Sequence, residues 1–206
     1  MLNRPVVCVV DDDDGVRRIT CRILEQAGND VRSYSGAEAF FAEFDESRTA
    51  CVVTDLRMPV TDGRQLLERL RMADSDVAVV MVTGHADVRT AVRLMEDGAL
   101  TLLEKPYEPE DLRSAVERAV ALTTKRREER AARMSASRRF EQLTDDERDV
   151  LEFMITGVPN KTIAARLTLS ARTVDRRRNA VLTKMGVGSV SELAALVTQF
   201  NLNKPR

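Results

Sequence analysis

The chain has 206 residues, of which 43% are hydrophobic, 32% charged and 4% aromatic, and it contains no tryptophan. This composition supports aliphatic cores, and it excludes a wholly disordered chain and a binding site made of stacked aromatic rings. The longest apolar run covers residues 77–82, whereas a membrane span needs about 20 residues, and the acidic run at Asp11 comes too early for a signal peptide. We therefore expect a cytoplasmic protein without membrane contact.

The cysteines and the charge distribution refine this expectation. Cys8, Cys21 and Cys51 lack metal-site spacing, so we expect reduced thiols. The overall charge of −1 conceals a gradient, because residues 1–122 carry 15 Lys and Arg against 23 Asp and Glu, a net −8, whereas residues 158–206 carry 9 against 2, a net +7. An acidic half joined to a basic tail suggests two domains with different partners, the second being a nucleic acid.

The first 120 residues alternate between apolar runs and helical patterns. Five apolar runs without polar alternation, typical of strands covered on both faces, are separated by segments of helical spacing. This order predicts an α/β domain with a doubly wound, five-stranded parallel sheet. The predicted strands cover residues 5–10, 31–34, 50–54, 77–82 and 100–103, and the helices cover 14–28, 36–45, 63–73, 86–97 and a segment from Glu108.

The remainder of the chain is predicted to be helical. Residues 123–139 lose the apolar stripe and carry a net +5, so we expect the fifth helix to continue as a solvated extension. Four short helices follow, with a capping box at Thr144, N-caps at Asn160 and Ser170, and a last helix opening at Ser191. They suit an all-α helix-turn-helix domain. The predicted boundaries are 1–122, 123–140 and 141–206.

Polar residues follow four of the predicted strands. Ligands of open parallel sheets bind beyond the carboxyl ends of the strands, where converging carboxylates need a cation such as Mg²⁺. Asp55 is the candidate nucleophile for phosphoryl transfer, Lys105 supplies an ammonium and Thr83 a hydroxyl. Taken singly, an aspartate run is typical of a solvated loop and a lone Asp of a turn. The residues after these strands are Asp11, Asp12, Asp13 and Asp14, then Asp55, then Thr83, then Lys105.

The motifs at residues 9–13, 54–59, 83–84 and 104–106 resemble the receiver domain of two-component response regulators, over residues 4–122. The resemblance implies a flavodoxin-like fold and Asp55 as the phosphoacceptor. It implies Asp11 and Asp12 as the acidic pair at the metal, with Asp12, Asp55 and the Arg57 main-chain carbonyl beside Mg²⁺. It further implies that Thr83 and Lys105 contact the phosphoryl group and that the Lys105–Pro106 bond is cis.

The sequence departs from the receiver pattern at one position. The family's usual switch aromatic lies three residues before the lysine, where this chain has Leu102, while Tyr107 lies on the other side of the lysine. We expect Asp55 still to be phosphorylated, whereas the conformational change that usually follows phosphorylation involves the aromatic that is missing here. His85 is interpreted as a loop residue near the site.

The predicted helix 171–185 presents two faces. Its apolar stripe lies opposite a polar face whose arginine and asparagine side chains suit guanine and adenine edges in the major groove. Lys161, Arg166 and Lys184 are expected to contact phosphates, although a solvated helix face is the plainer interpretation of each charge alone. The candidate DNA contacts are Arg172, Asp175, Arg176, Arg177, Asn179, Thr183, Lys161 and Lys184.

The motifs at residues 157–164, 169–175 and 184–187 resemble the LuxR-type helix-turn-helix, over residues 141–199. Arg177 stands where histidine is common in that family, and Asp175 is suited to accept from cytosine. A receiver followed by this module resembles the NarL/FixJ group of response regulators, its FixJ-like subset in particular. The resemblance implies a sensor histidine kinase as partner, a double-stranded DNA operator and a homodimer when phosphorylated.

Two alternatives stay open. The acidic pocket also suits an aspartyl-phosphate phosphatase, although such enzymes usually place the nucleophile on the first strand. The tail also allows an RNA-binding antitermination regulator with the same receiver. Our prediction is a transcription factor that takes part only in its own phosphorylation and dephosphorylation, and is not an enzyme acting on another substrate.

Overall fold

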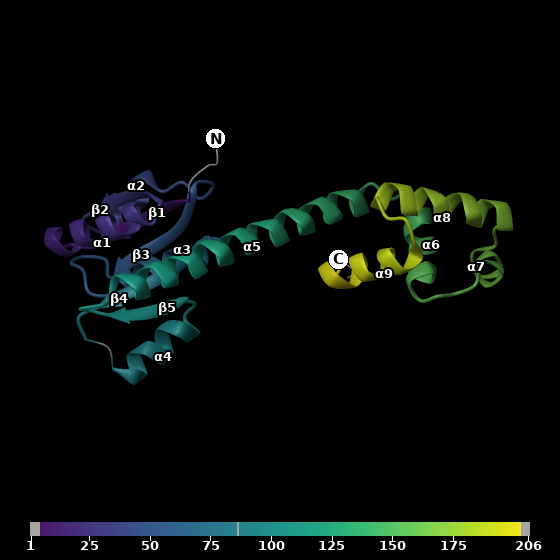
Figure 1. The fold of residues 1–206 in the computed structure, drawn as a ribbon. Coiled ribbons are helices and arrows are strands. Elements are labelled where there is room, and N and C mark those ends of the chain that lie inside the picture. The colour runs from purple at the N-terminus through teal and green to yellow at the C-terminus, as the bar shows by residue number, and fades with distance from the viewer. Residues whose placement is uncertain (1–4, 86, 203–206) are drawn as a thin grey trace. The chain divides into compact units, whose positions relative to one another are not determined.

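The computed structural model describes residues 5–85 and 87–202. The chain divides into two compact units, Met1–Arg127 and Glu128–Arg206 (Figure 1). The predicted domain boundaries differ slightly from this division and remain a prediction.

The first unit contains the predicted five-stranded parallel sheet, with the order β2-β1-β3-β4-β5. The three central strands are almost completely buried, as their predominantly apolar sequences predict. The edge strand β2 differs, because four of its five residues are at least partly exposed. The strands are β1 (Val6–Val10), β2 (Asp30–Tyr34), β3 (Thr49–Asp55), β4 (Ala78–Thr83) and β5 (Thr101–Glu104).

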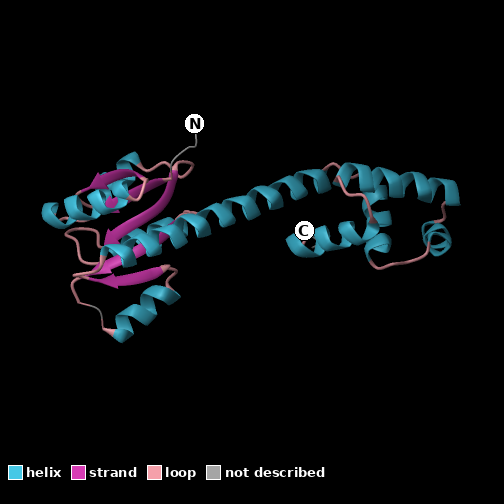
Figure 2. Cartoon of the chain, in the orientation of Figure 1, coloured by secondary structure: helices cyan, strands magenta, loops and turns pink. Residues whose placement is uncertain are grey.

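Helices cover both faces of this sheet (Figure 2). One core cluster joins alternate strand residues to side chains of α2, α3 and α4, and a second joins the other strand residues to α1 and α5. The doubly wound class is therefore confirmed. The helices are α1 (Asp14–Gln26), α2 (Ala37–Glu43), α3 (Gly63–Met72), α4 (Val88–Glu96) and α5 (Pro109–Glu141). Ala86, the predicted start of the fourth helix, lies outside the described residues.

Helix α5 begins in the first unit, and its residues after Arg127 belong to the second. Within the first unit, α5 is tied to the sheet by the buried hydroxyl of Thr123, which accepts the backbone N–H of Ala78 at 2.9 Å. Arg127 donates to the carbonyl of Thr49 at 2.7 Å. The helix extends to Glu141, and residues 128–135 are exposed as predicted, whereas Thr123 and Ala136 of the predicted solvated segment are buried.

The second unit packs α6 (Asp145–Ile155), α7 (Asn160–Leu167), α8 (Ala171–Met185) and α9 (Val190–Phe200) around one aliphatic core. The capping box at Thr144 and the cap at Ser170 are confirmed. The predicted cap at Asn160 is wrong. The N-cap of α7 is Pro159, and the Asn160 side chain bonds to Asp175. Helix α9 begins at Val190, one residue before the predicted opening at Ser191, and its N-cap is Ser189.

Over the residues that the structure describes, no single helix is long and apolar enough to cross a membrane. Helices α8 and α9 satisfy the length and composition test only when joined across a bend of 54°.

Candidate functional site

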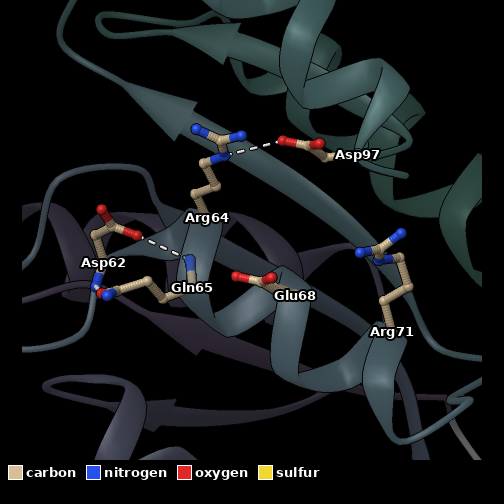
Figure 3. Close-up of a pocket in the computed structure, with 6 residues that line it drawn as sticks. All are labelled: Asp62, Arg64, Gln65, Glu68, Arg71 and Asp97. Atoms are coloured by element: carbon tan, nitrogen blue, oxygen red, sulfur yellow. Dashed lines mark hydrogen bonds and ion pairs between the residues drawn. The ribbon is translucent and has the colours of Figure 1, made fainter.

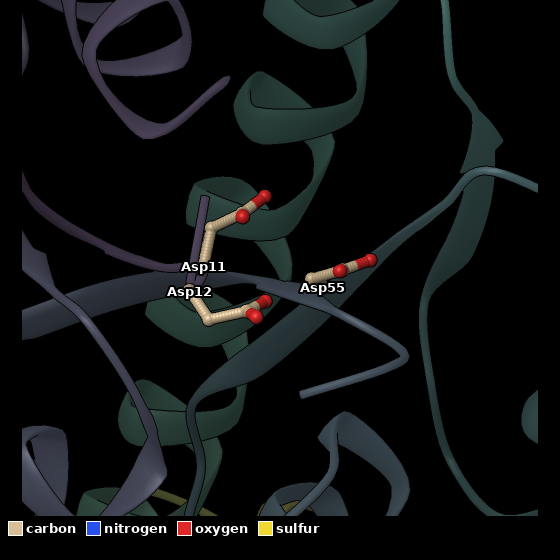
Figure 4. A group of neighbouring side chains, drawn as sticks. All are labelled: Asp11, Asp12 and Asp55. Carbon is tan, nitrogen blue, oxygen red and sulfur yellow. The ribbon is translucent and has the colours of Figure 1, made fainter. Parts of the chain in front are cut away.

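Three carboxylates converge at the carboxyl edge of the sheet. Asp11 and Asp12 follow β1 and Asp55 ends β3, and one oxygen of each lies within 4.8 Å of the others (Figure 4). Because β1 and β3 are parallel neighbours, their ends meet at the same edge, as the sequence predicts. Asp11 is buried, Asp12 is exposed, and 12% of the Asp55 side chain is exposed.

Lys105, directly after β5, places its ammonium between two of these carboxylates. Its Nζ lies 2.8 Å from Asp11 Oδ2 and 3.5 Å from Asp55 Oδ1, and its backbone N–H donates to the Thr83 carbonyl. Burial alone lowers the pKa of Lys105, but the hydrogen bond to Asp11 and the Asp55 charge outweigh it, so the pKa lies above its ordinary value. Lys105 is therefore a firmly charged cation. The Lys105–Pro106 bond is cis, as the resemblance implies.

The Asp55 carboxyl is held in an environment that opposes its charge. Burial raises its pKa above the ordinary value, and the nearby Asp11 charge adds to this effect, whereas the Lys105 ammonium opposes it. The nearby Arg57 backbone N–H also lowers the Asp55 pKa, as the smallest of these influences. A further cation beside Asp55 would relieve the charge repulsion.

The run of four aspartates is divided between the pocket and α1. Asp13 caps the helix by accepting the N–H groups of Gly15 and Val16, and these bonds lower the pKa of its carboxyl. Asp14 forms an ion pair with Arg17. The structure therefore assigns only the first two aspartates to the pocket.

Thr83 lies at the same edge, at the end of β4 between β3 and β5. It is 1% exposed, and its hydroxyl donates to the His85 carbonyl at 3.1 Å. This hydroxyl would have to rotate to meet a phosphoryl oxygen. Leu102 lies partly buried in β5 and packs against the first core cluster.

The pocket suits a hard divalent cation. It offers oxygen donors only, and three carboxylates with one ammonium leave a formal charge of −2. Mg²⁺ is bound in proteins by one or two carboxylates together with waters and phosphate oxygens. The exposed Asp12 leaves one side of this group open to solvent.

A separate hollow of about 270 Å³ lies on the outer side of α3 (Figure 3). Its wall carries charges of both signs, and Arg64 closes one side through an ion pair with Asp97 at 2.9 Å. This arrangement lacks the convergent carboxylates of the pocket beside Asp55.

The second candidate site is the polar face of α8. Val174, Val181 and Met185 are fully buried in the helical core, whereas the opposite face lies in solvent. The loop after α7 and the Ser170 cap precede this helix, as in a helix-turn-helix. The exposed residues predicted for this face are Arg172, Asp175, Arg176, Asn179 and Thr183.

Three predicted DNA contacts already have partners within this unit. Asp175 accepts from the Asn160 amide at 2.6 Å, and Arg177 forms an ion pair with Asp146 of α6. Lys184 donates to Glu147 at 2.6 Å and to the Gln142 carbonyl at 3.2 Å. These side chains fix α8 against α6 and α7.

Lys161, by contrast, is exposed at the start of α7. Arg166, at the other end of the same helix, is exposed as well, and its guanidinium lies 5.5 Å from the Phe153 ring centre. Both positions are compatible with the predicted phosphate contacts.

Two of the contacts that the sequence does not predict lie beside the candidate sites. One is the bond between Asn160 and Asp175, and the other joins the hydroxyls of Tyr107 and Thr20 at 2.6 Å. Both join residues at least 15 positions apart, and no spacing rule signals such a pair.

An acidic pocket with a lysine at the edge of a doubly wound sheet, followed by a helix-turn-helix domain, defines the response-regulator class of transcription factors. Comparison with known proteins agrees, because residues 7–117 match the response regulator receiver domain and residues 141–197 match the luxR family of bacterial regulatory proteins. The chain belongs to the family of two-component response regulators with a luxR-type DNA-binding domain.

Similar proteins span the whole chain. The transcriptional regulatory protein FixJ of Azorhizobium caulinodans is 38% identical over 92% of this chain and 90% of its own length. The tetrathionate response regulatory protein TtrR of Salmonella typhimurium is 35% identical over 90% and 88%. Among solved structures, response regulator StyR has a TM-score of 0.85 at 34% identity, covering 95% of this chain and 99% of that chain. Full-length FixJ from B. japonicum has a TM-score of 0.57 at 34% identity, covering 98% and 100%.

Proposed function

We propose that Asp55 is the phosphoacceptor and that its phosphorylation by a sensor histidine kinase controls sequence-specific DNA binding through α8. The observation that carries this proposal is the convergence of Asp11, Asp12 and Asp55 within 4.8 Å, with Lys105 3.5 Å from Asp55. Asp55 alone among the three carboxylates ends the central strand.

The chemistry assigned to each side chain follows from this geometry. An Asp55 carboxylate oxygen attacks phosphorus, the new P–O bond forms as the donor's bond to phosphorus breaks, and the donor leaves with its electron pair. Lys105 offsets the negative charge on the transferring group, and the Thr83 hydroxyl, once rotated, donates to one of its oxygens. The receiver thus modifies itself and turns over no external substrate.

Asp11, Asp12, Asp55 and the Arg57 carbonyl would hold Mg²⁺ in this pocket. When bound, the ion supplies positive charge to phosphoryl oxygens as negative charge develops there. Asp11 remains the partner of Lys105 and orients its ammonium. Asp12, exposed to solvent, completes the donor set.

Intact-mass measurement with acetyl phosphate and Mg²⁺ tests the phosphoacceptor. We expect one phosphoryl adduct on the wild type, lost with a chelator and absent from Asp55→Asn. Asp14→Asn is the matched control, since this exposed aspartate of the same run pairs with Arg17. An adduct that persists on Asp55→Asn, or none on the wild type, overturns the assignment. Turnover of a phosphate ester that needs Asp12 but not Asp55 would instead favour a phosphatase.

The DNA contacts are proposed for the exposed face of α8. Arg172, Arg176 and Asn179 have the donors to read base edges in the major groove, with Thr183 further along the same face. Lys161 is assigned a phosphate contact. Arg177, Asp175 and Lys184 are assigned to the rim, where their partners on α6 and α7 orient them.

Binding to a library of duplex sequences tests these roles. Arg176→Ala is expected to relax the sequence preference, whereas Lys161→Ala weakens binding to all sequences alike. Arg118→Ala, an exposed arginine of the receiver, is the control. If both helix variants bind as the wild type does, the assigned face is wrong, and preference for RNA in competition would favour the antitermination alternative.

We further propose that the phosphorylated protein is a homodimer on a two-fold operator. Helix-turn-helix dimers contact half-sites about one helical turn apart, roughly 10 base pairs centre to centre. Sedimentation with and without acetyl phosphate measures the oligomeric state, and a monomer under both conditions would contradict this part.

A further inference from the structure

Tyr107 is joined to α1 by a directional hydrogen bond. Its ring packs against the second core cluster, and its hydroxyl lies 2.6 Å from Oγ1 of Thr20, a residue that is 2% exposed. The Thr20 hydroxyl already donates to the Val16 carbonyl at 2.9 Å. Because a hydroxyl has one proton, the Tyr107 O–H is the donor in this contact.

The same chain of bonds continues into the acidic pocket. The Val16 N–H donates to Asp13 Oδ1 at 3.0 Å, and the Asp13 N–H donates to Asp11 Oδ1 at 2.9 Å. The other oxygen of Asp11 accepts from Lys105 at 2.8 Å. Since Tyr107 follows Lys105 by two residues, the bonds and the intervening backbone form a closed ring.

This ring fixes the ammonium relative to the carboxylates. The Lys105 side chain has four rotatable bonds, so its position depends on the backbone that carries it and on its partners. The backbone N–H of Lys105 is bonded to the Thr83 carbonyl on one side, and Tyr107 fixes the chain on the other. Without the Tyr107 bond, the segment after Lys105 loses its polar link to α1.

We propose that Tyr107 is a positioning residue for the phosphoryl-transfer site, acting with Thr20 to hold Lys105 between Asp11 and Asp55. It touches none of the reacting groups itself. The inference rests on the proposed phosphorylation of Asp55 and extends it to residues outside the pocket. A purely structural tyrosine would stabilise the fold without changing how Lys105 acts.

Phosphorylation rates with acetyl phosphate and Mg²⁺ provide the first test. Tyr107→Phe removes only the donor, and Thr20→Val removes its acceptor. Each is expected to slow Asp55 phosphorylation by about 2- to 10-fold, the range that corresponds to one net hydrogen bond. Thr20→Ser keeps the hydroxyl and should react as the wild type does. Wild-type rates for both Tyr107→Phe and Thr20→Val would overturn the proposal.

Repeating the substitution in a Lys105→Ala background separates positioning from general stability. If Tyr107 acts through Lys105, Tyr107→Phe leaves the already reduced rate of Lys105→Ala unchanged, because coupled residues are non-additive. An equal fold-loss in both backgrounds would show that Tyr107 acts independently of the lysine, which contradicts the proposal.

A spectroscopic measurement does not depend on phosphorylation. The chain has five lysines, so the ¹³Cε signal of Lys105 can be assigned by its loss in Lys105→Arg. At fixed pH, Tyr107→Phe should move this signal toward that of the exposed Lys161, and an unmoved signal would refute positioning. If the wild type takes no phosphate, the proposed function fails, while this measurement still decides the role of Tyr107.

Discussion

Gly63, the first residue of α3, lies against the backbone of the proposed phosphoacceptor. A Cβ added at this position would lie 2.3 Å from the Asp55 carbonyl oxygen and 3.1 Å from the Leu56 Cα. Real Cβ atoms keep at least 3.0 Å from such atoms, so Gly63→Ala requires a displacement of at least 0.7 Å. Both neighbours are backbone, and neither can rotate away.

The clash outweighs the benefit of alanine. Replacing glycine within a helix gains up to about 1 kcal/mol, whereas forcing an extra methyl group into a packed site costs roughly 1–3 kcal/mol. The end of β3 is paired with β4, and the Gly63 N–H donates to the Leu56 carbonyl. Whether β3 or α3 shifts, the loop that carries the Arg57 carbonyl moves with it.

We therefore expect Gly63→Ala to impair both folding and chemistry. The melting temperature should fall by a few degrees, and Asp55 phosphorylation by acetyl phosphate should slow by on the order of 10- to 100-fold, since a misplacement of about 1 Å has effects of this size. Gly36→Ala is the matched control, because Gly36 precedes α2 and has open space where its Cβ would lie. If Gly63→Ala melts and reacts as the wild type does, the close approach has no functional consequence and our argument fails.

Three further substitutions test individual features by thermal or denaturant unfolding. Val60 is 92% exposed and has a φ of 69°, a backbone conformation that strains a β-branched residue. Val60→Asn should therefore stabilise the protein by roughly 1 kcal/mol. An unchanged or lower stability would contradict this reasoning. Thr123→Val leaves the buried N–H of Ala78 unpaired and should lower the free energy of unfolding by about 1–3 kcal/mol. Thr124→Val, which removes an exposed hydroxyl, should lower it little. Equal losses of stability in the two variants would refute this argument. Burial raises the pKa of Glu147, but hydrogen bonds from Lys184 and the Thr144 N–H outweigh it and hold the pKa below the ordinary 4.5. The loss of folding stability caused by Glu147→Gln should therefore be full at pH 7 and shrink as the pH falls through the pKa of the folded state. A loss of stability that does not change with pH would contradict the ion pair.

The architecture of the first unit was predictable because its strongest signal is physical burial on two faces. Central strands covered by helices on both sides favour apolar residues on both faces. The strands β1, β3 and β4 are apolar over most of their length, and the exceptions are Thr49, Thr54, Asp55 and Thr83. Parallel strands bring their carboxyl ends to one edge, so the residues after the strands can be grouped from the sequence alone. The pocket at Asp11, Asp12 and Asp55 follows from that rule.

The details that the sequence does not determine are choices among competing partners. Asp13 and Asp14 have the same chemistry as Asp12, and only the start of α1 commits them to a cap and to Arg17. Asn160 has the residue type of an N-cap, yet it bonds to Asp175, 15 residues later. Local propensity could not predict that partner, because the partner becomes a neighbour only after α7 and α8 have packed.

Competition between partners also limits how many cations of the basic tail are available to contact DNA. Its charge in the sequence suggests that every cation on or near α8 is available to phosphates, but Arg177 and Lys184 are paired with Asp146 and Glu147 at the start of α6. Such pairs partly neutralise the charge that would release counterions from DNA, so each contributes less to salt-dependent affinity than an unpaired cation would. Their larger contribution is orientation, because both contacts hold α8 from one side. In the proposed mode of binding, recognition then depends on the exposed face carrying Arg172, Arg176 and Asn179, on a helix packed into the core of this unit.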